Sequence, residues 1–376
     1  MDKRFWRAPD KGEGPGESDG RRRHERKGFA TDALRQNGSA LQHASADLKN
    51  DKEFVMALVQ QGERALKHAS DTLKTDTEIV TAAVRQNGSA LEYASAALKN
   101  DKDVVMAAVQ QDGRALKHAS ARLKNDPKIV VTAAVQQDGR ALQHASADLK
   151  NDKEVVMVSV RQDGWALKYA SADLKNDKKI AMAAVQQDGR ALKHASDTLK
   201  SNTEVVTAAV QQNGWALDYA SEALKNNKEV VMDAVQQNRR ALEYASDTLK
   251  IDKDVVTAAV RKNGWALQHA SATLKNDEEV VMVAVKQAWW ALKYASAALK
   301  DDKEIVMAAV KQDGRALRFA SRGLKNDKKF VTDAVRWDVR ALQYASSALQ
   351  ALGIAVFILL IEEEDRLLLD TTRSSD

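Results

Sequence analysis

The 376-residue chain contains no cysteine and only three prolines, and aromatic residues make up 5% of it. The absence of cysteine excludes a disulfide framework, a thiol nucleophile and a cysteine-ligated metal site. There is no run of about 20 apolar residues, so no conventional membrane-spanning helix is expected. Residues 1–23 lack the apolar core of a secretory signal. We therefore expect an intracellular protein (cytoplasmic, nuclear or organellar) that is not secreted.

Charge of both signs is abundant. The chain has 58 Lys and Arg against 53 Asp and Glu, for a net charge of +5, and charged residues make up 30% of the sequence. Ala, Leu, Val and Gln supply much of the remainder. This composition is typical of a long helical array. A net charge this small does not predict a basic stripe that follows a nucleic-acid backbone.

The dominant feature is an internal repeat. The string Ala-Leu-x-(His/Tyr/Phe)-Ala-Ser recurs every 25 residues, with one spacing of 26 between the fourth and fifth copies. The copies begin at Ala40, Ala65, Ala90, Ala115, Ala141, Ala166, Ala191, Ala216, Ala241, Ala266, Ala291, Ala316 and Ala341. A repeat of this length is one supersecondary unit that must stack on its neighbours to bury a core.

Each unit is predicted to contain two short helices. In the unit that starts at Asp101, one face of the first helix carries Val104, Val105, Ala108 and Val109. The second helix presents Ala115, Leu116, Ala119 and Leu123 at helical spacing. Capping boxes are predicted to open the first helix at Asn50, Thr75, Asn151 and Ser201. A turn glycine in a left-handed conformation is expected to end it. The prediction is an all-α protein, an α-solenoid (superhelix or arch) of about thirteen αα-hairpin repeats.

The repeat resembles a known family. Residues 213–221 read NGWALDYAS and residues 263–267 read NGWAL, which is similar to the tandem repeats of domain of unknown function 4116. The resemblance covers residues 29–349 and implies an α-helical repeat with no established activity and no catalytic residues to transfer. The turn glycine is replaced at Glu63, Arg239, Trp289 and Val339. These hairpins are predicted to be strained, or to merge their two helices.

Three regions are predicted along the chain. Residues 1–28 form a basic leader without apolar periodicity, expected to be disordered. The array covers residues 29–350. Residues 351–376 begin with an apolar stretch and continue with an acidic one. The apolar stretch is interpreted as a cap on the last repeat, with peripheral membrane contact through residues 354–361, or docking to a partner, as alternatives.

One repeat position holds His, Tyr or Phe. A ligand position would not accept these side chains interchangeably, so it is interpreted as a half-buried packing position rather than a metal site. The His and Ser of each copy are two residues apart and would point away from each other on a helix, which excludes a nucleophile–base pair within one unit. The serine is expected to bond a backbone carbonyl one turn earlier. We expect no enzymatic activity, no cofactor and no small-molecule substrate.

A second position, which we call the Arg/Trp slot, opens the second helix and holds mostly Arg or Trp. It lies four residues before the aromatic position, so contacts such as Trp165 with Tyr169 are expected. The simpler interpretation is packing between repeats, with Arg lying over apolar neighbours. The alternative is a recognition surface, since exposed Trp and Arg are frequent hot-spot residues of protein interfaces. The candidate partner-binding residues are Arg114, Arg140, Trp165, Arg190, Trp215, Arg240, Trp265, Trp290, Arg315 and Arg340.

These observations favour a non-enzymatic scaffold that binds another protein, or an extended peptide, along equivalent positions of successive repeats. One alternative is single-stranded RNA binding by stacked aromatic and basic side chains, which the balanced charge makes less favoured. Another is a structural subunit of a membrane-associated complex.

Overall fold

The computed structural model describes residues 38–61, 65–136, 140–238 and 240–351. The chain divides into two compact units between residues 196 and 197, which we call unit 1 and unit 2. The described residues form helices and turns and contain no strand, which confirms the predicted all-α solenoid of tandem repeats. The predicted leader, and all of the predicted tail except residue 351, lie outside these residues.

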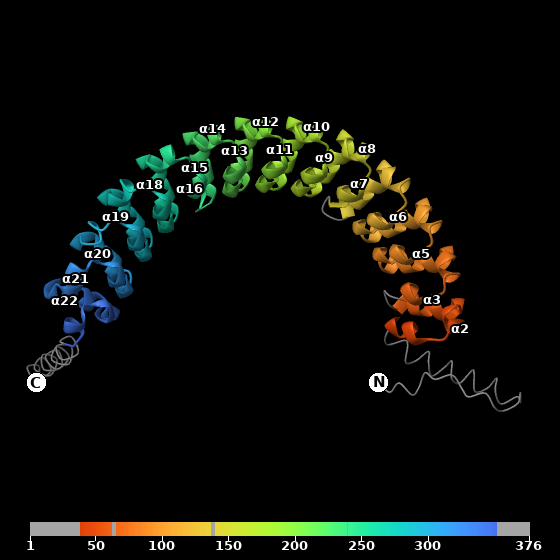
Figure 1. The fold of residues 1–376 in the computed structure, drawn as a ribbon, viewed down its shortest axis with the longest axis horizontal. Coiled ribbons are helices and arrows are strands. Elements are labelled where there is room, and N and C mark those ends of the chain that lie inside the picture. Colours follow the sequence, from red (N-terminus) through yellow and green to blue (C-terminus); the bar gives the residue numbers. More distant parts are fainter. Residues whose placement is uncertain (1–37, 62–64, 137–139, 239, 352–376) are drawn as a thin grey trace, which may run out of the picture. The chain divides into compact units, whose positions relative to one another are not determined.

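Each repeat begins with a long helix, and within each unit successive long helices pack side by side (Figure 1). Most are ten residues long, and α20 has eight. In unit 1 they are α3 (Lys52–Gln61), α5 (Thr77–Gln86), α6 (Lys102–Gln111), α7 (Pro127–Gln136), α9 (Lys153–Gln162) and α11 (Lys178–Gln187). In unit 2 they are α13 (Thr203–Gln212), α15 (Lys228–Gln237), α18 (Lys253–Lys262), α19 (Glu278–Gln287), α20 (Lys303–Val310) and α22 (Lys328–Trp337).

A middle segment follows, and in most repeats it is a 3-10 helix. In unit 1 the middle segments are η2 (Gly38–His43), α4 (Ala65–His68), η4 (Gly88–Tyr93), η6 (Gly113–His118), η8 (Arg140–His144), η9 (Gly164–Tyr169) and η10 (Gly189–His194). In unit 2 they are η11 (Gly214–Tyr219), α16 (Ala241–Tyr244), η12 (Gly264–His269), η14 (Trp289–Tyr294), η15 (Gly314–Phe319) and η16 (Val339–Tyr344).

A third segment of about one helical turn completes the repeat and lies along one edge of the row of long helices, as α8 and α10 do in Figure 1. In unit 1 the third segments are α2 (Ala46–Lys49), η3 (Leu73–Thr75), η5 (Leu98–Asn100), η7 (Leu123–Asn125), α8 (Ala147–Lys150) and α10 (Ala172–Lys175). In unit 2 they are α12 (Asp197–Lys200), α14 (Glu222–Lys225), α17 (Asp247–Lys250), η13 (Leu274–Asn276) and α21 (Arg322–Asn326).

The predicted core is confirmed. In α6, Val104, Val105, Ala108 and Val109 are buried, as are the predicted apolar residues of the two following segments. The same positions are buried in the neighbouring repeats because, within each unit, successive long helices pack against each other. The core is therefore a continuous row in each unit, as expected for a solenoid.

The long helices begin one residue later than predicted. Asp76 is the N-cap of α5, and its carboxylate accepts hydrogen bonds from the backbone N–H groups of Glu78 and Ile79. A side chain at the N-cap reaches these two N–H groups, which have no partner within the helix. The predicted caps were Asn50, Thr75, Asn151 and Ser201. In each case the actual cap is the next residue in the sequence.

The predicted second helix is divided in two at the Ala-Ser pair. Ala119 is extended, with φ −65° and ψ 159°. The backbone N–H of Ser120 donates to the carbonyl of Lys99 in the preceding repeat at 2.8 Å. The hydroxyl of Ser120 accepts from the backbone N–H of Leu123, which caps the third segment. Each repeat therefore breaks its helix in order to hydrogen-bond its neighbour.

The same hydroxyl makes a second contact between repeats, which we call the serine clasp. The Oγ of Ser120 donates to Oδ1 of Asn100 at 2.6 Å. The expected bond from this serine to a carbonyl one turn earlier is therefore wrong, because the preceding repeat supplies the acceptor. Equivalent clasps at 2.5 to 3.0 Å join Ser70–Asn50, Ser146–Asn125, Ser171–Asn151, Ser196–Asn176, Ser246–Asn226, Ser296–Asn276 and Ser346–Asn326.

The turn glycines are required by close approach rather than by a left-handed conformation. Gly164 is the first residue of η9, and the residue before it is extended, with φ −142°. A Cβ on Gly164 would overlap the carbonyl oxygen of Ala184 in the next long helix, and a Cβ on Gly214 would overlap that of Ala234. The prediction of a left-handed glycine was therefore wrong. The small residue is needed where two repeats meet.

The structure describes this turn position in two of the four repeats that lack the glycine. Trp289 and Val339 begin middle segments of the usual length, so neither hairpin merges its helices. The next long helix after Trp289 is α20, which is the shortest of the long helices that the structure describes. Glu63 and Arg239 lie outside the described residues.

Candidate functional site

In most repeats the Arg/Trp slot is the second residue of the middle segment, and the turn before it determines its position. The backbone N–H of Trp165 donates to Oδ1 of Asp163 at 2.9 Å, and that of Arg114 donates to Oδ1 of Asp112 at 2.9 Å. The Asp or Asn at this turn thus caps the middle segment. Most described slots are held in equivalent positions by the same local hydrogen bond, which the slot of Trp290 lacks because its turn residue is Ala288.

Side chains in neighbouring slots contact each other across the repeats of each unit. The guanidinium of Arg190 lies over the ring of Trp165 at 5.6 Å, and that of Arg240 lies over the ring of Trp215 at 5.5 Å. These distances are within the range of cation–π attraction. Of the predicted ladder of guanidinium and aromatic groups, these two pairs are present.

The ring partners of the slot tryptophans belong to the following repeat. The ring centroid of Trp165 is 5.2 Å from that of His194, in an edge-to-face arrangement, and Trp215 is 6.5 Å from Tyr244. The contact expected within one repeat, between Trp165 and Tyr169, assumed an α-helix. In a 3-10 helix, residues three apart lie one above the other, so residues four apart diverge.

The four slot tryptophans differ in their contacts within the fold and in how exposed they are. The indole N–H of Trp165 donates to Asp188 at 2.7 Å, and the side chain is half-buried. Trp215, Trp265 and Trp290 are exposed by 40%, 42% and 45%. Trp165 is therefore a packing residue between repeats, whereas the other three leave a large apolar surface in solvent.

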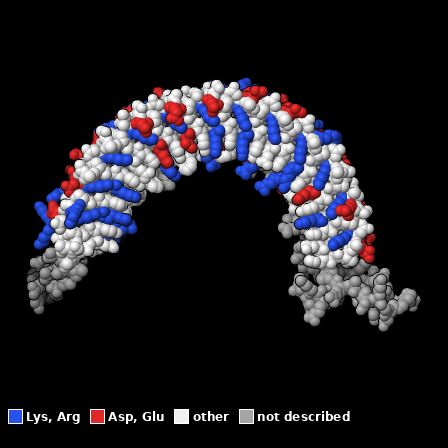
Figure 2. Space-filling view, in the orientation of Figure 1, with Lys and Arg blue, Asp and Glu red and all other residues white. Residues whose placement is uncertain are grey.

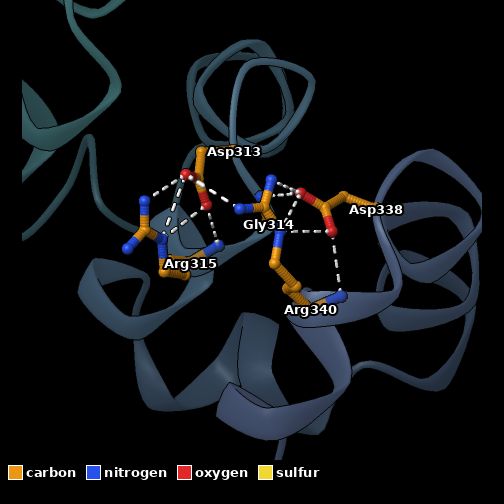
Figure 3. A network of polar contacts seen from close by, with 5 residues as sticks. All are labelled: Asp313, Gly314, Arg315, Asp338 and Arg340. Carbon is orange, nitrogen blue, oxygen red and sulfur yellow. Dashed lines mark hydrogen bonds and ion pairs between the residues drawn. The ribbon is translucent and has the colours of Figure 1, made fainter.

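Several slot arginines are paired with the aspartate of their own turn. Arg315 and Arg340 bind Asp313 and Asp338 through paired N–H groups at 2.7 to 3.0 Å, and Arg340 also reaches Asp313 (Figure 3). The backbone N–H of Gly314 donates to Asp338 at 2.6 Å. The arginine hydrogen bonds hold the pKa of both carboxyl groups below the ordinary value. Arg190 binds Asp188 in the same way.

Other slot arginines use acids at other positions. Arg140 binds Asp163 at 3.1 Å, and Arg240 binds Glu243 at 3.0 Å. Arg114 is exposed. On the face shown in Figure 2, Lys and Arg recur from repeat to repeat within each unit, while Asp and Glu gather mainly along one edge. Much of the guanidinium charge along the slot is thus neutralised locally.

Sequence reasoning missed two kinds of residue. Asp188, Asp313 and Asp338 bind slot arginines, and the signal was the recurrence of Asp two residues before Arg. Trp289, which we treated as a departure from the turn glycine, stacks on Phe319 at 6.1 Å and lies under Arg315 at 5.3 Å. Its repeat position gave no indication of this role.

The aromatic position is half-buried throughout the described repeats in which its burial is known, apart from the exposed His43. Burial, followed by the charge of Lys117, lowers the pKa of the His118 imidazole. The Nε2 atom of His118 is buried without a hydrogen-bond partner among the described residues. Within those residues, no group of three His, Cys, Asp or Glu side chains is placed to hold a metal ion. The geometry of the position is that of packing.

In the part of the chain that the structure describes, no helix is both long and apolar enough to cross a membrane. The proposed membrane-contact stretch, residues 354–361, lies outside that part and remains a prediction. No curated protein matches the chain.

A family model does match, in tandem. The model described as Domain of unknown function (DUF4116) matches ten overlapping segments at residues 27–74, 58–99, 76–124, 101–150, 128–175, 152–200, 177–225, 202–250, 252–300 and 302–350. These segments cover most of the chain and follow the repeats seen in the structure. The chain belongs to the family of the Domain of unknown function (DUF4116) repeats.

Proposed function

We propose that this chain is a non-enzymatic repeat scaffold that binds another protein, or an extended segment of one, through its Arg/Trp slot. The observation that carries the proposal is the exposure of Trp215, Trp265 and Trp290 at equivalent positions of different repeats. Exposed tryptophans cost solubility and are over-represented at the centres of protein interfaces. Their regular spacing would let one extended partner contact several repeats.

The arginines support the same interpretation. Arg190, Arg240 and Arg315 lie over tryptophan rings and bind carboxylates, so their planes are already ordered. Ordered side chains lose less conformational entropy when a partner docks on them. Because these charges are matched by acids, the slot does not provide the row of free cations that a nucleic-acid backbone would require. A protein partner is therefore favoured over RNA.

In most described repeats the serine and histidine that could suggest catalysis make contacts of a structural kind. The recurrent serine hydroxyl caps a helical turn and makes the clasp, as Ser120 does. The recurrent histidine is half-buried, and in His118 its pKa is lowered by burial. A nucleophile would need a free hydroxyl beside a general base. These contacts support the proposal that no reaction is catalysed here.

Affinity capture tests the proposal. The full chain would be compared with the triple variant Trp215→Ala, Trp265→Ala, Trp290→Ala, and the captured proteins quantified by mass spectrometry. Proteins held by the slot should be depleted by about tenfold or more in the triple variant, since each tryptophan is a candidate hot spot. Trp337→Ala is the matched control, because Trp337 is 62% exposed and lies outside the slot.

Circular dichroism should report the same helicity for all three proteins, because the substituted side chains are exposed. Equal capture by the triple variant would refute the proposal. Salt-sensitive retention of RNA that depends on the same tryptophans would assign the slot to nucleic acid instead. Flotation with liposomes that is lost on removal of residues 351–376 would support the membrane-associated alternative.

A further inference from the structure

Unit 2 contains an open groove between two consecutive Arg/Trp slots. It has a volume of about 440 Å³ and is lined by Asn263, Trp265, Trp290, Lys293 and Tyr294. The indole N–H of Trp265 donates to the hydroxyl of Tyr294, which ties the two walls together. The groove thus has two exposed indoles, a tyrosine ring and one ammonium group within reach of a single ligand.

The groove lies where the arginine that covers two other slot tryptophans is missing. Trp165 and Trp215 are each followed 25 residues later by an arginine that lies over the indole. Trp265 is followed by Trp290 at that position. The next slot residue, Arg315, lies over Trp289 and is bound to the carboxylate of Asp313. This is the one place in the described residues where two slot tryptophans are consecutive.

The groove is also flanked by cations without nearby acids along the chain. Residues 255–276 and 280–300 contain no Asp or Glu. The turn positions that hold Asp beside the slot arginines hold Asn263 and Ala288 here. Exposed basic residues lie at the C-terminal ends of the two long helices that lead into these turns; they are Arg261, Lys262 and Lys286. A further exposed lysine, Lys293, follows Trp290. Glu243, in the preceding repeat, binds Arg240 and lies 3.9 Å from His269.

We infer that the groove of Trp265 and Trp290 binds an extended peptide segment in which prolines are flanked by acidic residues. The inference deepens the proposed function and rests on it. Rows of Trp and Tyr side chains accept the rings of prolines in an extended polyproline conformation, which costs little entropy to order. The indole N–H of Trp290, which has no partner among the described residues, is available to a peptide carbonyl. The surrounding lysines and arginines complement carboxylates.

Single-stranded nucleic acid also combines flat rings with negative charge, but the surroundings fit it less well. A nucleic-acid strand needs cations that continue along its backbone. Beyond the groove, the next slot arginines, Arg315 and Arg340, are already bound to Asp313 and Asp338. The unmatched positive charge is local, which suits a short acidic segment.

The test uses the full chain and three fluorescent probes. One is a peptide that repeats Glu-Pro-Pro about four times, the second replaces each Glu by Lys, and the third is an oligouridylate of similar length. Binding is measured by fluorescence anisotropy at low and high salt. The acidic peptide should bind, and the charge-inverted peptide should bind at least about tenfold more weakly because it meets Lys293 and its basic neighbours.

Variants locate the site. Trp290→Ala should weaken binding of the acidic peptide by about tenfold or more, as expected for a hot-spot aromatic residue. Lys293→Gln should weaken it by about threefold, mostly at low salt, because an exposed charge contributes little and is screened. Trp337→Ala should leave it unchanged. If Trp290→Ala loses helicity by circular dichroism, the site is tested with Lys293→Gln instead, because that variant changes one exposed side chain.

The inference is overturned if the lysine peptide binds as tightly as the acidic one, if only oligouridylate binds, or if Trp337→Ala has the effect expected of Trp290→Ala. Absence of binding by all three probes would overturn it as well. Failure here does not decide the proposed function, because a partner could still be captured through Trp215 in the triple-variant experiment. Conversely, peptide binding in the groove with unchanged capture would show that the groove binds such a segment while the captured partners are held elsewhere on the chain.

Discussion

Unit 1 and unit 2 have the same internal framework and display different side chains. The aromatic position of unit 1 holds five histidines and two tyrosines, whereas that of unit 2 holds four tyrosines, one histidine and Phe319. Within the described residues, the exposed tryptophans all belong to unit 2; they are Trp215, Trp265, Trp290 and Trp337. The buried aliphatic residues, the backbone bonds between repeats and the capped helix starts recur in both.

The difference shows which positions of the repeat are constrained. Positions that contact the neighbouring backbone accept few side chains, because a bond or a close approach depends on them. Positions at the margin accept His, Tyr, Arg or Trp, and these determine what each unit offers to solvent and to partners. Four predictions test this contrast, and they run from the largest expected effect to the smallest.

The turn glycine should contribute equally to the stability of both units. Gly164→Ala in unit 1 and Gly214→Ala in unit 2 each place a Cβ against a carbonyl oxygen of the next long helix. Each should lower the free energy of unfolding by about 1–3 kcal/mol through overpacking. Urea unfolding measures this change in the free energy of unfolding. Gly323→Ala is the control, because that glycine is helical and a Cβ there would approach only side-chain atoms. A loss in one unit alone would contradict a shared framework.

The serine clasp can be added where it is missing. In unit 2 the clasp position before Ser221 holds Ser201, and the Ser221 hydroxyl is buried without a partner among the described residues. Ser201→Asn should supply the acceptor and raise the free energy of unfolding by about 1 kcal/mol. Asn100→Ala, which removes a clasp from unit 1, should lower it by about as much.

Thermal unfolding of these variants beside Ser201→Ala separates the hydrogen bond from other effects, since alanine removes a side chain without providing an acceptor. If Ser201→Asn and Ser201→Ala unfold at the same temperature, the clasp contributes nothing to stability.

Acid should destabilise unit 1 more than unit 2. Burial is the main cause that lowers the pKa of His68, His118 and His144 in unit 1, and of His269 alone in unit 2. A lowered pKa means that the folded state favours the neutral imidazole. The unfolded chain therefore takes up protons first as the pH falls below the ordinary value of 6.5, and stability is lost there. Above that pH the contribution is fully present.

His118→Tyr with His144→Tyr tests this directly, because tyrosine occupies the same position in most of unit 2. The thermal midpoint of the wild type should fall between neutral pH and about pH 5, whereas the double variant should show a smaller fall. His269→Tyr is the unit 2 control. Equal slopes for the wild type and the double variant would show that these imidazoles are not the titrating groups.

The smallest effect is expected from the ion pairs that join successive helix starts. Lys102 lies 2.7 Å from Asp126 in unit 1, and Lys253 lies 2.9 Å from Asp277 in unit 2. The lysines are exposed, so solvent and salt screen the attraction. Lys102→Gln and Lys253→Gln should each change the thermal midpoint only slightly, and less at high salt. A large loss from either would mean that the pairs stabilise the stacking directly.

Much of the fold could be predicted from the repeat. Periodicity identified the long helix and its buried face, as Val104, Val105 and Val109 show. Two of the errors share one cause. The role of Gly164 and the acceptor of Ser120 depend on a neighbouring repeat, which the pattern of a single unit does not show. The recurrence of Arg and Trp in one slot was visible in the sequence, but the separation of packing Trp165 from exposed Trp290 required the neighbours' positions.

The sequence by itself determined that the chain repeats, that each repeat is helical and which aliphatic side chains are buried, because these follow from local periodicity and from the need to cover apolar surface. Only the tertiary structure decided which slot side chains are covered. That depends on whether the next repeat supplies an aspartate and an arginine that contact the indole, as Asp188 and Arg190 do for Trp165, or a second indole that leaves a groove, as Trp290 does for Trp265. Contacts between repeats arise from residues about 25 positions apart, so no single repeat contains the information.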